Sequence, residues 1–246
     1  MKSILLTNDD GIDAEGLKTI RDDLRRFAHV IVVAPDRERS AVSHGLTIHP
    51  PHPKSEEAGP DSFSLSGTPA DCVLYALDRL FSRPPDLVIS GINHGSNLGD
   101  DVMYSGTVAA AREAAKCGIP AIAVSQYYES LAKIRFSEGS EFVSDMVKAM
   151  FDNGLDGEFL FNVNIPIGKI RGMKITRQGC SEHTRHFSIP VGEGDSSLIF
   201  GKDSLISDVL AVSNGYVSIT PLGRDQTDYA AARALTEAAV ELLRKC

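Results

Sequence analysis

Short runs of hydrophobic residues alternate with amphipathic segments through the first half of the chain. Four of these runs have the length and content of buried strands and lie at 3–7, 30–34, 86–90 and 119–125. Three segments between them carry apolar residues at helical spacing and lie at 14–27, 69–81 and 105–118. This regular alternation predicts an α/β fold with a doubly wound, Rossmann-like, mostly parallel sheet.

The second half of the chain departs from that rhythm. We expect a helix near 137–151, strands near 159–166, 171–179 and 215–223, and a closing helix at 228–245. Residues 180–208 are rich in Gly, Ser, Asp and His and show little periodicity. We therefore predict one domain over 1–246 with a β-rich excursion over 170–215, and long excursions of this kind are usually functional, oligomeric or flexible.

Composition and charge limit the kinds of binding partner and the cellular compartment that we expect for the protein. With 25 Lys and Arg against 33 Asp and Glu the net charge is −8 and no long basic run occurs, which argues against a nucleic-acid polymer but leaves a small anionic ligand open. The four cysteines are far apart, so we expect neither a zinc site nor a disulfide framework. No run is long enough to span a membrane, and the first apolar run is too short for a signal peptide. We expect a cytoplasmic protein.

The polar and glycine-rich segments of the chain follow three of the expected strands. These segments are residues 8–11, 34–45 and 90–107. Ligands of open α/β sheets bind outside the carboxyl ends of the strands. Loops are polar in general, but the concentration of such residues in these three loops favours a functional site there.

The first of these loops contains two adjacent carboxylates, Asp9 and Asp10, followed by Gly11. Adjacent carboxylates repel unless a cation lies between them, so the pair is either solvated turn chemistry or half of a metal site. Taken alone, the pair is better explained as a turn. With neutral oxygens such as those of Ser40 and Asn93 nearby, the donor set would suit Mg²⁺ or Mn²⁺ rather than zinc.

The third loop enters a helix through Ser105, Gly106 and Thr107. Hydroxyl groups and free backbone N–H groups at a helix start form an anion site, most simply for phosphate. An ordinary N-cap explains the same residues about as well when they stand alone. Beside a metal held by aspartates, a phosphate site has the layout of metal-assisted phosphoester hydrolysis.

Further candidates lie in the same loops. Ser43, His44 and His94 are possible substrate contacts, and either histidine could donate a proton or contact phosphate. Each histidine is more often a plain hydrogen-bonding loop residue. His183 and His186, in the excursion, receive no role.

Several blocks of the sequence resemble the SurE family of stationary-phase survival nucleotidases, from end to end and in order. These blocks are ILLTNDDGI, VVAPDRERSAVSHGLT, GTPADCV, PDLVISGINHGSNLGDDVMYSGTVAAAREA, GIPAIAVS, NVNIP and GYVSITPL. The resemblance implies a divalent-metal-dependent phosphatase that acts on nucleoside 5'- and 3'-monophosphates with one Mn²⁺ or Mg²⁺ per subunit. The metal ligands it implies are Asp9, Asp10, Ser40 and Asn93.

The resemblance also implies the phosphate contacts and an assembly. The implied phosphate contacts are Asn97, Ser105, Gly106 and Thr107. The family forms dimers and tetramers through an exchanged β-hairpin and C-terminal segment, which would suit residues 170–215. Asp9 or Asp10 would orient the attacking water and accept its proton, so both are the expected catalytic residues. Two local departures, His94 and the SHGLT stretch, touch no implied ligand and leave substrate preference open.

Two other functions remain open at this point. A haloacid-dehalogenase-like phosphatase would use an aspartyl nucleophile, but that class requires Asp-x-Asp-Gly after the strand, and the chain has Asn8-Asp9-Asp10-Gly11. A non-catalytic nucleotide-binding module would use the same loops, although phosphate binding alone is better served without anionic neighbours. A dinucleotide-binding domain fails because no G-x-G-x-x-G turn follows the first strand.

Overall fold

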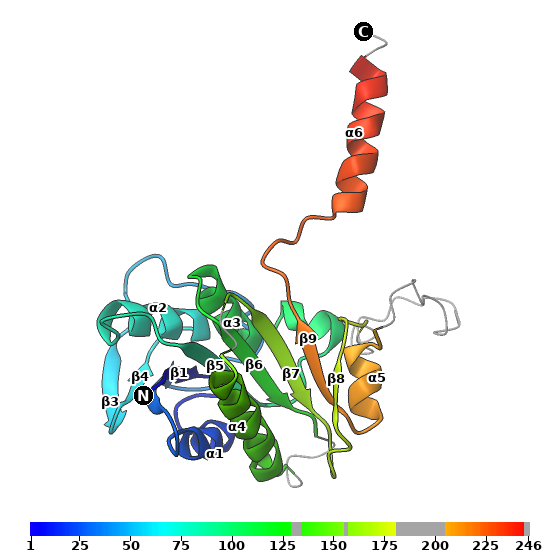
Figure 1. Ribbon diagram of the computed structural model, residues 1–246. Coiled ribbons are helices and arrows are strands. Elements are labelled where there is room, and N and C mark those ends of the chain that lie inside the picture. Colours follow the sequence, from blue (N-terminus) through cyan, green and yellow to red (C-terminus); the bar gives the residue numbers. More distant parts are fainter. Residues whose placement is uncertain (129–133, 155–156, 181–204, 244–246) are drawn as a thin grey trace, which may run out of the picture.

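The computed structural model of the protein describes residues 1–128, 134–154, 157–180 and 205–243 (Figure 1). The strands are β1 Ser3–Thr7, β2 His29–Pro35, β3 Ser55–Gly59, β4 Ser62–Leu65, β5 Leu87–His94, β6 Ala121–Gln126, β7 Leu160–Ile165, β8 Met173–Ile175 and β9 Val217–Pro221. The helices are α1 Glu15–Leu24, α2 Pro69–Arg79, α3 Gly106–Lys116, α4 Phe136–Asp152, α5 Asp208–Ser213 and α6 Tyr229–Leu243, with a 3₁₀ turn, η1, at Gly99–Met103.

The described strands form one sheet in the order β3-β4-β2-β1-β5-β6-β7-β9-β8. Its centre is parallel, and only the β3–β4 and β7–β9 pairs are antiparallel. The predicted doubly wound, mostly parallel α/β fold is confirmed. The chain runs from β1 outward to β2 and later returns to β5 on the other side of β1, which makes the β1–β5 edge the switch point of the topology. Ligands of such sheets bind at this place.

Helices cover both faces of the sheet, because successive strand residues point to opposite sides. Ile4 and Leu6 of β1 belong to the core under α1 and α4, while Leu5 belongs to the core under α2 and α3. The helical spacing noted in the sequence buries Leu17, Ile20 and Leu24 of α1 against this first core. The start of α3 lies against the turn that follows β1, where Gly106 and Thr107 contact Asp9.

The β3–β4 hairpin and the helix α5 were not expected from the sequence. The β3–β4 hairpin lies at one edge of the sheet, and every residue of β3 is exposed, so no hydrophobic alternation marks that strand. The short helix α5 buries Asp208, Ala211 and Val212 in a segment without visible periodicity. These elements are decided by their neighbours and not by their own hydrophobic pattern.

The expected β-rich excursion over 170–215 is only partly described, since residues 181–204, including His183 and His186, lie outside the described residues. The described part consists of β8 at the sheet edge, one bridge between Arg177 and Ser207, and α5. Its role as an oligomerisation segment stays a prediction.

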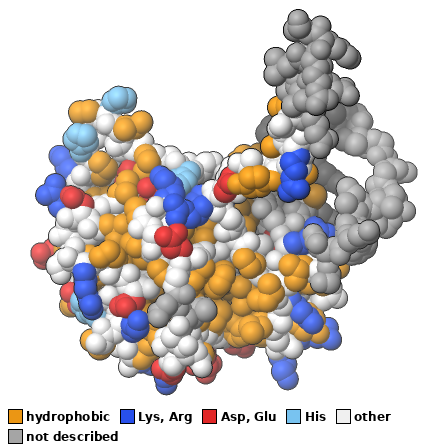
Figure 2. All heavy atoms as spheres, turned by 45° about the horizontal axis from the view of Figure 1, so that its top comes forward, with side chains coloured by type: hydrophobic (Ala, Val, Ile, Leu, Met, Phe, Trp, Pro, Cys, Tyr) orange, Lys and Arg blue, Asp and Glu red, His pale blue; other side chains and the backbone are white. Residues whose placement is uncertain are grey.

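The last helix, α6, stands clear of the body of the molecule (Figure 1). Its Tyr229 and Leu235 side chains are exposed by 60% and 72%. None of the helices in the described part of the chain is both long and apolar enough to cross a membrane. On the face shown in Figure 2, Lys and Arg side chains are scattered between hydrophobic and uncharged ones and form no continuous basic surface.

Candidate active site

The acidic pair sits on a turn that Asn8 closes. The Asn8 side-chain amide donates to the carbonyl of Gly11 at 2.9 Å and its oxygen accepts the Gly11 N–H at 3.2 Å. Gly11 has a φ of +102°, and a Cβ there would come within 3.1 Å of the carbonyl carbon of Arg37. Glycine is needed for this turn, which places Asp9 and Asp10 directly after β1 at the switch point.

Asp9 is buried against the start of α3. Its side chain is 4% exposed and accepts a hydrogen bond from the Thr107 hydroxyl, while its backbone oxygen accepts the Arg39 N–H at 2.7 Å. A Cβ on Gly106 would lie 2.9 Å from both the Cβ and the Oδ2 of Asp9, so the approach of α3 to this carboxylate requires glycine. The carboxylate of Asp9 therefore lies where the N-terminus of α3 favours negative charge.

Burial is the largest cause of the unusual acidity of Asp9. The pKa of Asp9 is raised from 3.8 to about 6, because burial and the nearby charge of Asp10 raise it more than the hydrogen bonds from Thr107 lower it. A carboxylate of this kind is costly to keep ionised and stands ready to accept either a proton or a cation. A buried group whose pKa is raised in this way is typical of functional sites.

Asp10 is bound by the residue that follows Asn93. Its Oδ2 accepts the backbone N–H of His94 at 3.1 Å and lies 3.0 Å from the ring Nδ1 of His94. This hydrogen bond raises the pKa of His94. The ring also packs edge-on against Phe136 at a centroid distance of 5.0 Å. His94 therefore joins the acidic pair to the start of α4, and the expectation that this residue touches no implied ligand is wrong.

The two neutral ligands expected from the sequence differ in burial: Asn93 is buried and Ser40 is exposed. Asn93 is 9% exposed and its amide nitrogen donates to the Gly95 carbonyl at 2.9 Å, which leaves its Oδ1 as the acceptor. Ser40 is exposed, and its hydroxyl donates to Glu38 at 2.8 Å. Ser40 directly follows Arg39, whose backbone N–H donates to the backbone oxygen of Asp9. Within the described ranges no group of three or more His, Cys, Asp and Glu side chains could hold a metal ion, so a cation here would depend on such neutral oxygens.

The Ser-Gly-Thr segment does two different jobs in the structure. The Ser105 hydroxyl accepts the Val108 N–H at 3.0 Å, which makes it the N-cap of α3. The Thr107 hydroxyl donates to Asp9. Gly106 provides the close approach to that carboxylate. The N-cap interpretation therefore holds for Ser105, and the role of the three residues as phosphate contacts stays a prediction.

Asn97 is anchored in a network of neutral polar groups that the sequence did not single out. Its side-chain amide donates to Ser125 at 2.7 Å, and its backbone N–H donates to Asn164 at 2.8 Å. Its carbonyl accepts from Asn162 and Asn164 at 2.7 and 3.1 Å. The signal for Asn162 and Asn164 was available, because two asparagines two positions apart in a buried strand face the same side.

His44 lies against α3 through a different carboxylate. Its Nε2 is 2.6 Å from Oε2 of Glu113, which is 4% exposed and also binds the Lys116 ammonium at 3.0 Å. The neighbouring Ser43 has a φ of +52° and donates its N–H to the Tyr104 carbonyl at 3.0 Å. The sequence reasoning missed Glu113, whose only signal is a charge on an otherwise alanine-rich face.

A family model described as survival protein SurE matches residues 4–185. The chain belongs to the SurE family. The family inferred from the motifs is thus confirmed. Relatives named 5'-nucleotidase SurE are 45% identical in Pelotomaculum thermopropionicum, 42% in Geobacter metallireducens and 38% in Syntrophotalea carbinolica. These matches cover 92%, 94% and 95% of this chain and 91%, 95% and 96% of the respective relatives.

The SurE fold is also found in a solved relative. A crystal structure of the SurE protein from Aquifex aeolicus matches with a TM-score of 0.80 and 36% identity, covering 96% of this chain and 99% of that one. In the present SurE chain, the NDDG and SGIN motifs meet at the switch point and the YSGT motif closes over them at the start of α3.

Proposed function

We propose that this SurE-family chain is a divalent-metal-dependent phosphomonoesterase that hydrolyses nucleoside 5'- and 3'-monophosphates to nucleoside and phosphate. The observation that carries the proposal is the pair Asp9 and Asp10, held at the switch point beneath the N-terminus of α3. The names of the relatives agree with the expected class of enzyme, a 5'-nucleotidase. Turnover of 3'-monophosphates rests on the sequence resemblance.

The donor groups fit one Mn²⁺ or Mg²⁺ per subunit. Two carboxylates, an amide oxygen and a hydroxyl are hard oxygen ligands, which these cations prefer. Asp9, Asp10, Asn93 and Ser40 would hold the ion, with Ser40 turning from Glu38. A cation beside Asp9 also removes the like-charge repulsion that contributes to the raised pKa of this group. When bound, it would neutralise phosphate charge and acidify a water molecule.

The other steps of the reaction, namely activation of the water and binding of the phosphate, would fall to side chains of the site. Asp9 or Asp10 orients the attacking water and accepts its proton. Thr107 fixes the Asp9 carboxylate. The start of α3, with Ser105 to Thr107, and Asn97 would bind the phosphate oxygens as their charge grows.

The proposed partners are small nucleoside monophosphates and further copies of the chain. The exposed Tyr229 and Leu235 on a helix that stands clear of the body support an assembly in which α6 contacts another subunit (Figure 1). A homodimer or homotetramer in the cytoplasm is the state expected from the sequence. Gel filtration with light scattering, before and after removal of residues 226–246, would measure this assembly directly.

The experiment that tests the proposed activity is phosphate release from 5'-AMP and 3'-AMP by the purified chain. Protein stripped with EDTA should release nothing, and Mn²⁺ or Mg²⁺ should restore release. A hydroxylamine-sensitive aspartyl phosphate trapped during turnover would support the haloacid-dehalogenase-like alternative. Nucleotide binding by folded, metal-supplemented protein without any release would identify the non-catalytic binding module.

A further inference from the structure

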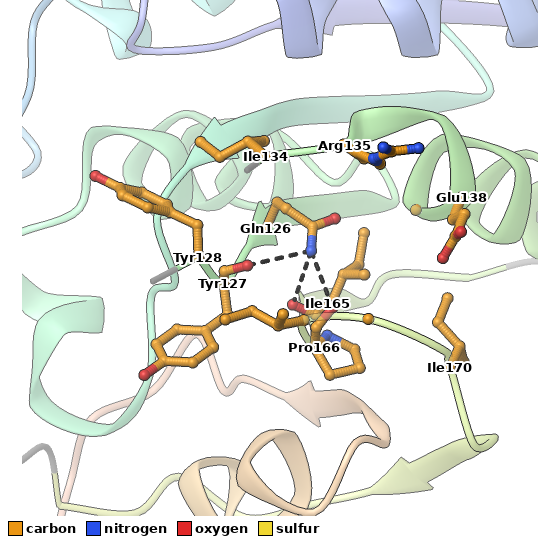
Figure 3. Close-up of a pocket in the computed structure, with 12 residues that line it drawn as sticks. Gln126, Tyr127, Tyr128, Ile134, Arg135, Glu138, Ile165, Pro166 and Ile170 are labelled. Atoms are coloured by element: carbon orange, nitrogen blue, oxygen red, sulfur yellow. Dashed lines mark hydrogen bonds between the residues drawn. The ribbon is translucent and has the colours of Figure 1, made fainter. Parts of the chain in front are cut away.

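A hollow of about 390 Å³ opens at the carboxyl ends of β6 and β7 (Figure 3). Three segments line it: residues 126–128 at the end of β6, 134–139 at the start of α4 and 165–170 at the end of β7. Its walls are mainly aromatic and aliphatic, and the exposed side chains of Arg135 and Glu138 lie together on the α4 side. This combination of apolar walls and a few polar groups is typical of a small-molecule site.

The hollow adjoins the candidate active site through the β5–β6 pairing. Asn93 is in register with Ser125 and His94 with Gln126, and the Gly95 N–H donates to the Gln126 carbonyl at 3.1 Å. A Cβ at Gly95 would lie 3.5 Å from the ring of Tyr128. Because neighbouring strands are about 5 Å apart, the hollow begins on the order of 10 Å from the end of β1, the span between the phosphate and the base of a nucleotide.

His94 provides a second link between the two places. Its ring contacts Asp10 on one side and packs on Phe136, at the start of α4, on the other. Two residues beyond Phe136 is Glu138, which lines the hollow. A molecule with its phosphate at the acidic pair would therefore pass over His94 and Gly95 to reach the hollow.

The shape of the hollow is fixed by Gln126 and Gly139. Gln126 is 5% exposed, and its amide nitrogen donates to the carbonyls of Tyr127, Ile165 and Pro166 at 3.3, 3.4 and 3.0 Å (Figure 3). A Cβ at Gly139 would lie 2.6 Å from Ile165 Cδ1 and 2.8 Å from Gln126 Oε1, so glycine alone lets α4 pack this closely. The strand ends and α4 are thus held together in a site that is already formed.

We propose that this hollow binds the nucleoside part of the substrate, with the base against Tyr128 and Ile134. The proposal rests on the proposed function, because it takes the phosphate to lie at Asp9 and Asp10. A flat heterocycle with polar edges fits aromatic and aliphatic walls with charged groups beside them. A sugar phosphate without a base would make no stacking contact with these walls, so its affinity would not depend on them.

The test fills the hollow without touching the phosphate site. Ile134→Trp places a large ring in the hollow, and Leu74→Trp, at a partly exposed leucine of α2, is the matched control. Both are assayed with metal on 5'-AMP and on ribose 5-phosphate, which lacks the base. Since stacking of one base is worth about 1–3 kcal/mol, we expect Ile134→Trp to lower kcat/KM for 5'-AMP about 10- to 100-fold, mainly through KM. The value for ribose 5-phosphate should stay within about twofold, and Leu74→Trp should change neither.

Each outcome decides the proposal. Equal losses on both esters, as expected if another copy of the chain covers the hollow, would overturn it, and so would unchanged activity on 5'-AMP. If the unmodified protein releases phosphate from neither ester, the proposed function fails, and equilibrium dialysis of adenosine alone then decides the nucleoside site. Adenosine binding that is lost in Ile134→Trp and kept in Leu74→Trp supports the site; equal binding by both variants, or no binding by the unmodified protein, overturns it.

Discussion

Two buried aspartates of this protein, Asp9 and Asp208, have opposite surroundings. Asp208 is fully buried, and its two oxygens accept backbone N–H groups of Gly99, Gly179 and Val209 at 2.8–2.9 Å. Asp9 is almost as deeply buried, but it faces the charge of Asp10. The carboxylate of Asp208 is surrounded by N–H donors from three segments. The carboxylate of Asp9 is repelled by the like charge of Asp10.

The difference separates a structural carboxylate from a functional one. Asp208 ties together the turn η1, the segment after β8 and the start of α5, and nothing about it calls for a ligand. A buried charge without enough compensation costs stability. A bound cation would remove the repulsion between Asp9 and Asp10. The loss of stability at this pair is therefore explained if a cation binds there. Four predictions test this contrast.

The largest effect is expected for Asp9→Asn. The variant keeps an acceptor for the Thr107 hydroxyl but loses a charged metal ligand, so phosphate release from 5'-AMP should fall about 1,000-fold or more. Its thermal midpoint without metal should not fall. Asp13→Asn, at an exposed surface position, is the control and should keep full activity. An unfolded Asp9→Asn protein would instead mark this carboxylate as structural.

For Asp208→Asn we expect a large loss of stability and little effect on the chemistry of the active site. An amide NH₂ would face backbone N–H donors that now meet a carboxylate oxygen, so the free energy of unfolding should fall by about 3–5 kcal/mol. Denaturant titration measures this loss. Folded variant protein should keep the metal dependence of the parent. A large loss of activity without a loss of stability would contradict the structural role.

The pH dependence of stability should differ between the parent and Asp9→Asn in EDTA. Because the folded pKa of Asp9 is about 6 against an ordinary 3.8, the native state holds the proton more tightly, and stability from this group is lost as pH rises from about 4 to 6. A shift of about two pKa units corresponds to at most about 3 kcal/mol. Asp9→Asn should therefore be the more stable protein at pH 8 and gain nothing at pH 4. Adding Mn²⁺ at pH 8 should reverse the order of the two proteins; a difference that stays constant with pH would exclude this origin.

The smallest effect is expected for Thr107→Val, which removes the hydroxyl bound to Asp9 while nearly keeping the shape of the side chain. The pKa of Asp9 should rise further, and activity should fall roughly tenfold, with the acid limb of the pH–rate profile moving to higher pH. Thr107→Ser retains the hydroxyl and should restore the parental profile. Equal losses in both variants would point to packing at the start of α3 instead.

Much of this molecule was predictable from local pattern. Continuous apolar runs gave β1, β2, β5 and β6 their places in a parallel sheet, because only a strand covered on both faces tolerates such runs. The edge hairpin β3–β4 was not predictable, since its exposed residues carry no period, and α5 depends on the burial of Asp208 by distant segments. The site residues could be named from their motifs, but Glu113 could not, because its partner His44 is far away in the sequence.

The amino-acid sequence by itself determined the class of fold, the family and the loops in which the chemistry would gather. These follow from short-range rules of hydrophobic period, turn residues and adjacent charges. Only the tertiary structure decided that Asp9 is buried beneath Thr107 and that Asp10 is bound to His94. Burial, pKa and the hollow beside the site depend on which strands become neighbours, and a switch point brings together residues more than 80 positions apart.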